Sequence, residues 1–294
     1  MSDLMSKPRV AILGLGNMGY GMASRMLSEK IPLTVYNRNA DKTKFFSEAG
    51  ATVASSPREA ASMADFIISM VADDGASRSV WLGKEGALAG ASPRAVLVEC
   101  STLTVTWVLE LGALAAQQEC EFLDAPVTGS KSHAAAGELL FLAGGSASTV
   151  EKAKPILSVL GRDVIHLGPN GSGARLKLIN NFLCGVQAAS FAEAVSMIVA
   201  GGLDMEKAAS ILTSGAPGSP LIKAISARAA AHDATVNFSL RLMAKDLGYA
   251  LKEAEKDGVP LDTASTALEI FKRAISKGLG NQDFSAIITS MSQE

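Results

Sequence analysis

The sequence has few cysteines, few aromatic residues and no excess of charge of either sign. Cys100, Cys120 and Cys184 are its only cysteines and lack a CxxC spacing, so we expect reduced thiols and no disulfide framework or thiolate metal site. Three scattered histidines likewise predict no metal site. The 27 Lys and Arg residues balance 29 Asp and Glu residues without a basic run, which argues against nucleic acid as a partner.

The sequence also lacks the pattern of a secretory signal and a long uninterrupted apolar run. Asp3 and Pro8 precede only a short apolar segment near the N-terminus, without the basic segment and cleavage site of a signal peptide. The most apolar long stretch, 183–202, is interrupted by Gln187 and Glu193, whereas a membrane helix needs about 18 apolar residues. We therefore expect a cytoplasmic protein with no membrane contact.

The composition that remains predicts a compact protein of two domains. Of its 294 residues, 48% are hydrophobic and 19% are charged, which suits a folded chain with a substantial core. Ser56, Pro57 and Glu59 form a typical helix start. Continuous apolar strands alternating with helices predict an α/β fold with a parallel sheet covered on both faces. The expected strands are 10–13, 33–36, 66–71 and 96–99.

Beyond about residue 170 the strand pattern stops and only helical patterns follow. We therefore predict an α/β dinucleotide-binding domain over 1–170 and an all-helical domain for substrate binding and oligomerisation over 171–294. A long helix is expected over 173–200, with an apolar stripe that should pack deep within the second domain. The stripe consists of Leu176, Ile179, Leu183 and Val186.

A GxGxxG motif follows the first expected strand and opens a helix. Gly14 permits a tight turn, Gly16 lets a pyrophosphate approach the backbone, and Gly19 lets the helix pack on the strand. The start of the helix would then face the phosphate charge. The motif predicts a dinucleotide site made by Gly14, Leu15, Gly16, Asn17, Met18 and Gly19.

The end of the second strand bears on the choice of dinucleotide. A carboxylate that binds the ribose hydroxyls of NAD is usual there, but this sequence has Asn37 and Arg38. Arginine can pair with a 2'-phosphate, so we predict a preference for NADP, with NAD possible. We place Val71, at the end of the third strand, at the cofactor as well.

Lys177 and Asn181 stand four residues apart on the expected long helix, and therefore on one face of it. A carbonyl that receives hydride develops negative charge on oxygen, which a protonated lysine can neutralise and protonate. An exposed lysine beside a helix-interior asparagine is the alternative, and spacing alone does not exclude it.

Five ordered motifs resemble the β-hydroxyacid dehydrogenase family, which includes 3-hydroxyisobutyrate dehydrogenases, tartronate semialdehyde reductases, and glyoxylate and succinic semialdehyde reductases. The motifs are 14–19, Ser101-Thr102, Asp124 to Ser130, Gly173 with Lys177 and Asn181, and Lys245-Asp246-Leu247. The resemblance covers nearly the whole chain. It implies a Rossmann-like domain, a helical domain opened by a long linking helix, an active site between them, and a homodimer or homotetramer.

Residue by residue, the resemblance implies Lys177 as the catalytic acid/base, Asn181 as the residue that orients the substrate, and Asp246 beside the reacting centre. It places Thr102 and Lys245 at the cofactor and Phe238 in the substrate pocket. The loop of Thr128, Gly129 and Ser130 offers N–H groups and hydroxyls to a substrate carboxylate. Thr128 replaces the more common serine of the family, and the Ser130-Lys131 continuation looks more like the glyoxylate and succinic semialdehyde reductases.

Together these features predict an NADP-preferring oxidoreductase. It would transfer hydride between the cofactor and the carbonyl of a small, carboxylate-bearing semialdehyde or 2-oxo acid. Two alternatives remain open: an imine reductase on the same scaffold, and a non-catalytic protein that senses the dinucleotide.

Overall fold

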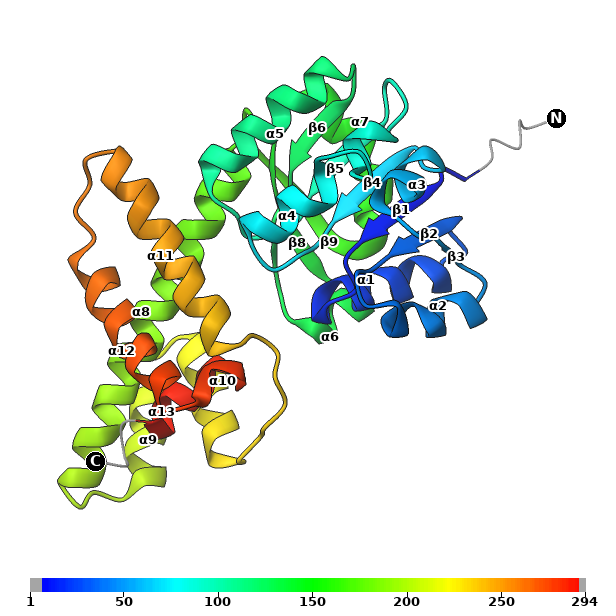
Figure 1. Cartoon of the computed structure of the whole chain (residues 1–294). Helices are drawn as coiled ribbons and strands as arrows, with labels where there is room; N and C mark the ends of the chain where they lie inside the picture. The colour runs from blue at the N-terminus through cyan, green and yellow to red at the C-terminus, as the bar shows by residue number, and fades with distance from the viewer. Residues whose placement is uncertain (1–6, 291–294) are drawn as a thin grey trace. The chain divides into compact units, whose positions relative to one another are not determined.

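The computed structural model of the chain describes residues 7–290 and confirms the α/β class (Figure 1). Contacts divide the described chain into two compact units, one ending at Lys177 and the other starting at Leu178. This division falls inside one long helix, seven residues beyond the boundary expected near 170, which stays a prediction. All three cysteines are free, with Cys100 and Cys120 buried and Cys184 partly buried.

The first unit is built on one sheet whose first six strands are parallel and follow the order β3-β2-β1-β4-β5-β6. The chain thus winds outward from β1 in both directions, and the switch in direction lies between β1 and β4. Beyond β6, the strand β8 pairs antiparallel with β6 and β7 and parallel with β9. The strands are β1 Val10–Leu13, β2 Leu33–Tyr36, β3 Thr52–Val53, β4 Phe66–Ser69, β5 Val96–Glu99, β6 Glu121–Asp124, β7 Val127–Thr128, β8 Leu139–Gly144 and β9 Gly161–Gly168.

Helices pack on this sheet, and one core cluster joins α1, α6 and α7 to the buried side chains of the strands. Val10, Ile12, Ile68 and Val98 of that cluster are fully buried, as expected for parallel strands covered on both sides. The helices of this unit are α1 Asn17–Ser28, η1 Ala40–Thr43, α2 Lys44–Glu48, α3 Pro57–Ser62, α4 Asp74–Trp81, η2 Ala87–Ala89, α5 Val105–Gln117, α6 Lys131–Ala136 and α7 Ala147–Leu160.

Local sequence signals account for several element boundaries. Ser56 caps α3 by accepting a hydrogen bond from the Glu59 N–H, and Pro57 is the first helical residue, as predicted. The strands expected at 10–13, 33–36 and 96–99 form with those bounds, whereas the strand expected over 66–71 ends at Ser69. The difference arises because Val71 donates its N–H to a side chain and not to a neighbouring strand.

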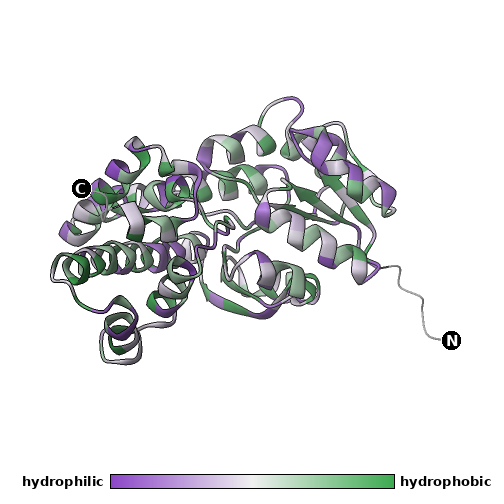
Figure 2. Cartoon of the chain, turned by 90° about the horizontal axis from the view of Figure 1, so that it is seen from below, coloured by the Kyte–Doolittle hydropathy of each residue, from purple (hydrophilic) through white to green (hydrophobic). Residues whose placement is uncertain are grey.

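The second unit is helical from its start, as predicted. Its core joins α8, α10, α11, α12 and α13. Figure 2 shows hydrophobic residues along the helices of the protein. Phe271, Leu240 and Leu247 are fully buried there. The helices are α8 Ser172–Ala200, α9 Met205–Ser214, α10 Pro220–Ala230, α11 Leu240–Lys256, α12 Asp262–Ser276, η3 Leu279–Asn281, η4 Phe284–Ala286 and α13 Ile287–Ser290.

The prediction for the buried face of α8 was wrong. Leu176, Ile179 and Leu183 of the expected stripe are 37%, 47% and 49% exposed, and only Val186, partly buried, packs against the core of the second unit. The buried face of α8 mixes small residues with larger apolar ones such as Phe191 and Ile198. At Gly185 only a small residue fits, because a Cβ there would stand 2.9 Å from a methyl carbon of Leu247 on α11. The sequence is apolar on both sides of α8, so its pattern alone did not distinguish them.

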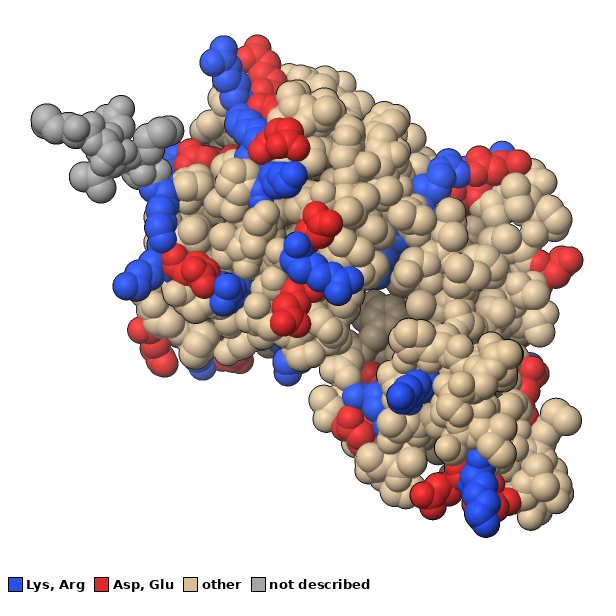
Figure 3. All heavy atoms as spheres, turned by 180° about the vertical axis from the view of Figure 1, so that it is seen from behind, with Lys and Arg blue, Asp and Glu red and all other residues tan. Residues whose placement is uncertain are grey.

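Helix α8 is apolar and long enough to cross a membrane by length and composition alone, with 39% of its most apolar window buried. Core helices of water-soluble proteins share this property. Gln187 and Glu193 therefore do not set α8 apart from a membrane helix, and the absence of membrane contact stays a prediction. On the face seen in Figure 3, basic and acidic side chains alternate and do not form a patch of one sign.

Candidate functional site

The glycine motif forms a close-packed turn with one open position. A Cβ on Gly14 would lie 2.4 Å from the carbonyl oxygen of Met70, and one on Gly19 would lie 2.0 Å from that of Gly14. Around Gly16, in contrast, no atom stands within 4 Å of an added Cβ. No side chain caps the start of α1 at Gly16, so the turn fits an anionic phosphate group that approaches the N–H groups of the first turn.

Asn37 holds this turn in place. Its Oδ1 accepts a hydrogen bond of 2.9 Å from the N–H of Leu15, and its Nδ2 donates one of 2.8 Å to the Asn39 carbonyl. Arg38 is exposed beside it. Both residues were expected at the cofactor. Asn37 braces the glycine turn and Arg38 is exposed, and the contact of either residue with a cofactor stays a prediction.

The ends of β4 and β5 are tied together through Ser101. The hydroxyl of Ser101 accepts a 2.8 Å hydrogen bond from the N–H of Val71, and the N–H of Ser101 donates to Oε1 of Glu99 at 2.9 Å. Thr102, partly buried, follows directly. Two of the residues expected at the cofactor, Val71 and Thr102, therefore lie on segments that one hydrogen-bond chain connects.

This chain of hydrogen bonds ends at Glu99, which was not predicted from the sequence as a supporting residue of the site. It is fully buried, and its Oε2 accepts hydrogen bonds from the Ser77 hydroxyl at 2.7 Å and from Trp81 Nε1 at 2.8 Å. Burial raises the pKa of the Glu99 carboxyl above its ordinary value, while the hydrogen bonds from Ser101, Ser77 and Trp81 oppose the shift. A carboxylate at the end of an apolar strand was the available signal, because buried acids are rare unless they are paired.

The loop expected to bind a carboxylate leaves β7 and begins α6. Gly129 takes a φ of +128°, which favours glycine. Ser130 donates its N–H to Nδ1 of His133 at 3.0 Å, and its hydroxyl lies 2.7 Å from the same nitrogen. Thr128 and Ser130 are partly buried and Gly129 is exposed, so the loop is accessible to a ligand.

Helix α8 carries Lys177 partly buried and, one turn later, Asn181 buried. Within the second unit, Nδ2 of Asn181 donates a 2.5 Å hydrogen bond to Oδ2 of Asp246 on α11. Asp246 is fully buried, and its Oδ1 lies 3.0 Å from Nζ of Lys245. The structure thus brings together three of the predicted site residues, Asn181, Lys245 and Asp246, from helices distant in sequence.

A groove of about 410 Å³ lies along α11 and α12 beside Lys245. The ammonium of Lys245 also lies 5.1 Å from the centre of the Tyr249 ring. Four cationic side chains line the groove around apolar residues, and two of them pair with carboxylates, Lys245 with Asp246 and Lys272 with Glu269. The cationic lining residues are Arg241, Lys245, Lys252 and Lys272.

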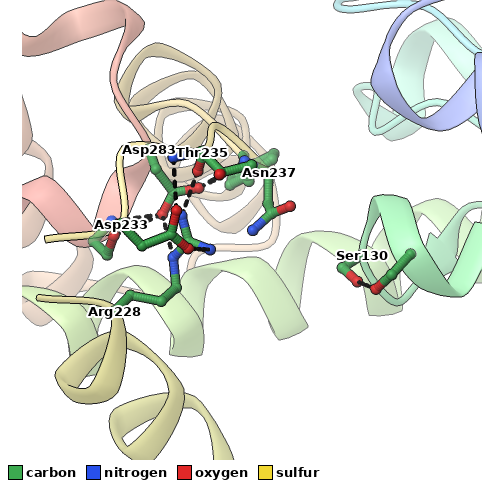
Figure 4. A network of polar contacts seen from close by, with 9 residues as sticks. Ser130, Arg228, Asp233, Thr235, Asn237 and Asp283 are labelled. Atoms are coloured by element: carbon green, nitrogen blue, oxygen red, sulfur yellow. Dashed lines mark hydrogen bonds and ion pairs between the residues drawn. The ribbon is translucent and has the colours of Figure 1, made fainter. Parts of the chain in front are cut away.

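Phe238 lies on the segment between α10 and α11. Asp283 fixes this segment, and Figure 4 shows it in one polar network with Arg228 and Asn237. Oδ2 of the buried Asp283 accepts hydrogen bonds from the N–H groups of Asn237 at 2.9 Å and Phe238 at 3.1 Å. Nε of Arg228 stands 3.5 Å from the other oxygen. The Phe238 ring meets Phe284 edge to face, with centroids 6.0 Å apart. Asp283 is a second supporting residue that sequence analysis missed.

Two known families match successive parts of the chain, one in each half. Residues 9–168 match the NAD binding domain of 6-phosphogluconate dehydrogenase, and residues 171–291 match the NAD-binding domain of NADP-dependent 3-hydroxyisobutyrate dehydrogenase. Both matches concern nicotinamide dinucleotide enzymes, in agreement with the geometry of the glycine turn.

Individual relatives match over nearly their full lengths. The NAD-dependent L-serine dehydrogenase of Pseudomonas aeruginosa is 34% identical, over 95% of this chain and 96% of that protein. The glyoxylate/succinic semialdehyde reductase 2 of Arabidopsis thaliana is 33% identical, over 98% of this chain and 81% of its own length. A solved structure of Mycobacterium tuberculosis 3-hydroxyisobutyrate dehydrogenase with L-serine has a TM-score of 0.88 at 29% identity and covers 97% of this chain and 99% of that one. The chain therefore belongs to the β-hydroxyacid dehydrogenase family and is a nicotinamide-dependent oxidoreductase.

Proposed function

We propose that this enzyme is an NADP-preferring reductase of small, carboxylate-bearing semialdehydes or 2-oxo acids, able to run in reverse as a hydroxyacid dehydrogenase. The observation that carries the proposal is the polar set on α8 and α11. Lys177 stands one helical turn from Asn181, whose amide donates to the buried Asp246 at 2.5 Å. A lysine can protonate the carbonyl oxygen and a fixed amide can donate a hydrogen bond to the substrate, so this pair suits carbonyl reduction.

In this proposal, Lys177 donates a proton to the carbonyl oxygen as negative charge develops there. Asn181 orients the substrate, and Asp246 keeps the Asn181 side chain in one rotamer, since a buried amide that donates to a carboxylate loses its freedom to turn. The bound nicotinamide supplies or accepts the hydride. In the oxidative direction Lys177 takes the proton back from the hydroxyl group.

For the cofactor, the glycine turn holds the pyrophosphate, with Asn17 and Met18 in the first turn of α1. Thr102 contacts the nicotinamide end, and Val71 and Lys245 also bind the cofactor. The preference for NADP rests on Arg38, which is exposed and can pair with a 2'-phosphate in a bidentate way. Relatives use either dinucleotide: one is an NAD-dependent dehydrogenase, and the family matched by residues 171–291 is NADP-dependent.

For the substrate, we assign the carboxylate to the loop of Thr128, Gly129 and Ser130 and one wall of the pocket to Phe238. The loop is accessible and its backbone is held open at Gly129. The named substrates of the relatives, L-serine, glyoxylate and succinic semialdehyde, all bear a carboxylate. This supports the class of substrate and leaves its identity to the assay.

We further propose that the enzyme is cytoplasmic and assembles as a homodimer or homotetramer. Exposed apolar side chains on α8, on α9 and in the turn between them support assembly: Met197 is 76% exposed, Leu203 62% and Ile211 69%. No residue of α9 is buried, and exposed apolar patches of this kind mark protein contacts.

The test is a panel of glyoxylate, succinic semialdehyde, methylmalonate semialdehyde and tartronate semialdehyde, each assayed with NADPH and NADH. Turnover of at least one acid with NADPH is expected. Cyclic imines in the same panel test the imine reductase alternative, which turnover of an imine alone would favour. Tight NADPH binding without turnover of any carbonyl or imine would favour a dinucleotide sensor.

A further inference from the structure

The residue before α8 offers no side chain that could cap the helix. Gly171, which precedes the helix, takes a φ of +91° and lacks a side chain, so it cannot accept the N–H bonds that a helix start leaves open. The first turn nevertheless lies at Gly173 against the sheet, where an added Cβ would stand 2.1 Å from the Leu142 carbonyl oxygen. The N–H groups of this buried turn therefore need acceptors from elsewhere.

Asp124, at the end of β6, supplies them. Its Oδ1 accepts a 2.8 Å hydrogen bond from the N–H of Gly171, and its Oδ2 accepts a 2.9 Å bond from the N–H of Ala174. The side chain is fully buried, and Gly144 leaves room for it, since a Cβ there would stand 2.6 Å from Oδ1. A carboxylate at this place also interacts favourably with the positive end of the helix dipole.

We propose that Asp124 is a positioning residue for Lys177: by capping α8 from the sheet, it fixes the first turn of the helix and thereby the place of the lysine in the next turn. Lys177 comes three residues after Ala174, so a rotation or fraying of the first turn displaces it directly. This inference rests on the proposed role of Lys177 in proton transfer. Burial raises the pKa of the Asp124 carboxyl, and the N–H groups of Ala174 and Gly171 oppose that shift.

Asp124→Asn tests the proposal, because the amide retains only one acceptor oxygen for two N–H groups. In the absence of cofactor and substrate, exchange of the Gly171 and Ala174 amide hydrogens should accelerate at least tenfold. The kcat should fall at least tenfold, while KM and the Kd for NADPH stay within about twofold. Asp204→Asn is the matched control, since Asp204 caps α9 by accepting the Lys207 N–H at 3.1 Å; it should leave kcat unchanged.

The decisive measurement is a double-mutant cycle with Lys177→Ala. If Asp124 acts through Lys177, Asp124→Asn lowers kcat in the wild type but has little further effect in the Lys177→Ala background. An equal fold-loss in both backgrounds, or unchanged exchange at Gly171 and Ala174, overturns the proposal. If Asp124→Asn does not fold, hydrogen exchange in the wild-type protein is the test. The Gly171 and Ala174 amides should then be protected at least tenfold more than the Lys207 amide. Failure of the proposed function would give a different result: the wild-type protein would reduce no carbonyl, while its Gly171 and Ala174 amides would still be protected from exchange.

Discussion

Asn181 and Asp246, 65 positions apart in the sequence, share a 2.5 Å hydrogen bond between Nδ2 and Oδ2. Asp246 is fully buried and its other oxygen lies 3.0 Å from Nζ of Lys245. One carboxylate thus fixes both an amide on α8 and an ammonium on α11. Close approach of the two helices at Gly185 makes this possible.

Asp246→Ala should lower the free energy of unfolding by about 3 kcal/mol, because it removes the partner of a buried amide and of a largely buried ammonium. Urea denaturation monitored by circular dichroism measures the loss. Asp257→Ala, at the exposed residue that directly follows the same helix, should cost less than about 0.5 kcal/mol. Similar losses for the two variants would contradict a structural role for the Asn181–Asp246 pair.

Lys177→Ala should lower kcat by at least ~100-fold while the Kd for NADPH changes little, since the lysine meets charge that exists chiefly in the transition state. Lys177→Arg should not restore kcat, because a guanidinium does not readily give up a proton. Steady-state kinetics and cofactor fluorescence measure the two effects. Lys223→Ala, an exposed lysine of α10, is the control; near-normal turnover of folded Lys177→Ala would refute the mechanism.

Arg38→Asp should weaken NADPH binding by about 1.5 to 3 kcal/mol, the range for a hydrogen bond to a charged group, and improve the use of NADH. The ratio of kcat/KM for the two cofactors is the measurement. Lys44→Asp changes the charge of another exposed side chain nearby in sequence and should leave the ratio almost unchanged. Wild-type enzyme that uses both cofactors with equal efficiency would remove the basis of this prediction.

Thr128→Val should raise the KM for carboxylate substrates at least threefold with a smaller change in kcat, because a contact with the carboxylate exists both before and during hydride transfer. Thr128→Ser keeps the hydroxyl and should behave like the wild type. Initial rates with the acid panel distinguish the two variants. If Thr128→Val has the same KM as the wild type for every acid, Thr128 is excluded from the substrate site.

Glu99 should make stability depend on pH in an identifiable direction. Burial raises its pKa above the usual 4.5, so the folded protein binds a proton more tightly than the unfolded chain and loses stability as the pH rises from about that value through the raised pKa. The unfolding free energy of the wild type minus that of Glu99→Gln, both measured in urea, should therefore decrease as the pH rises through this window. A difference that grows with pH would show that the carboxylate is favoured by folding.

The sequence by itself determined the α/β class, the position of the dinucleotide turn and the order of the family motifs. These features depend on local patterns: apolar runs of strand length, Gly14 and Gly19 where only a hydrogen fits, and Ser56 with Pro57 at a helix start. Such signals act over a few residues, so they can be recognised without knowledge of the fold.

Only the tertiary structure decided which side chains support the candidate site. The buried face of α8 was mispredicted because apolar residues surround the helix, and the choice between faces depends on the helix that packs at Gly185. The Asp124 cap of α8 and the Asp283 clamp on Phe238 join residues 47 and 45 positions apart. Hydrogen bonds over such separations depend on how strands and helices meet, and a local sequence pattern does not contain that information.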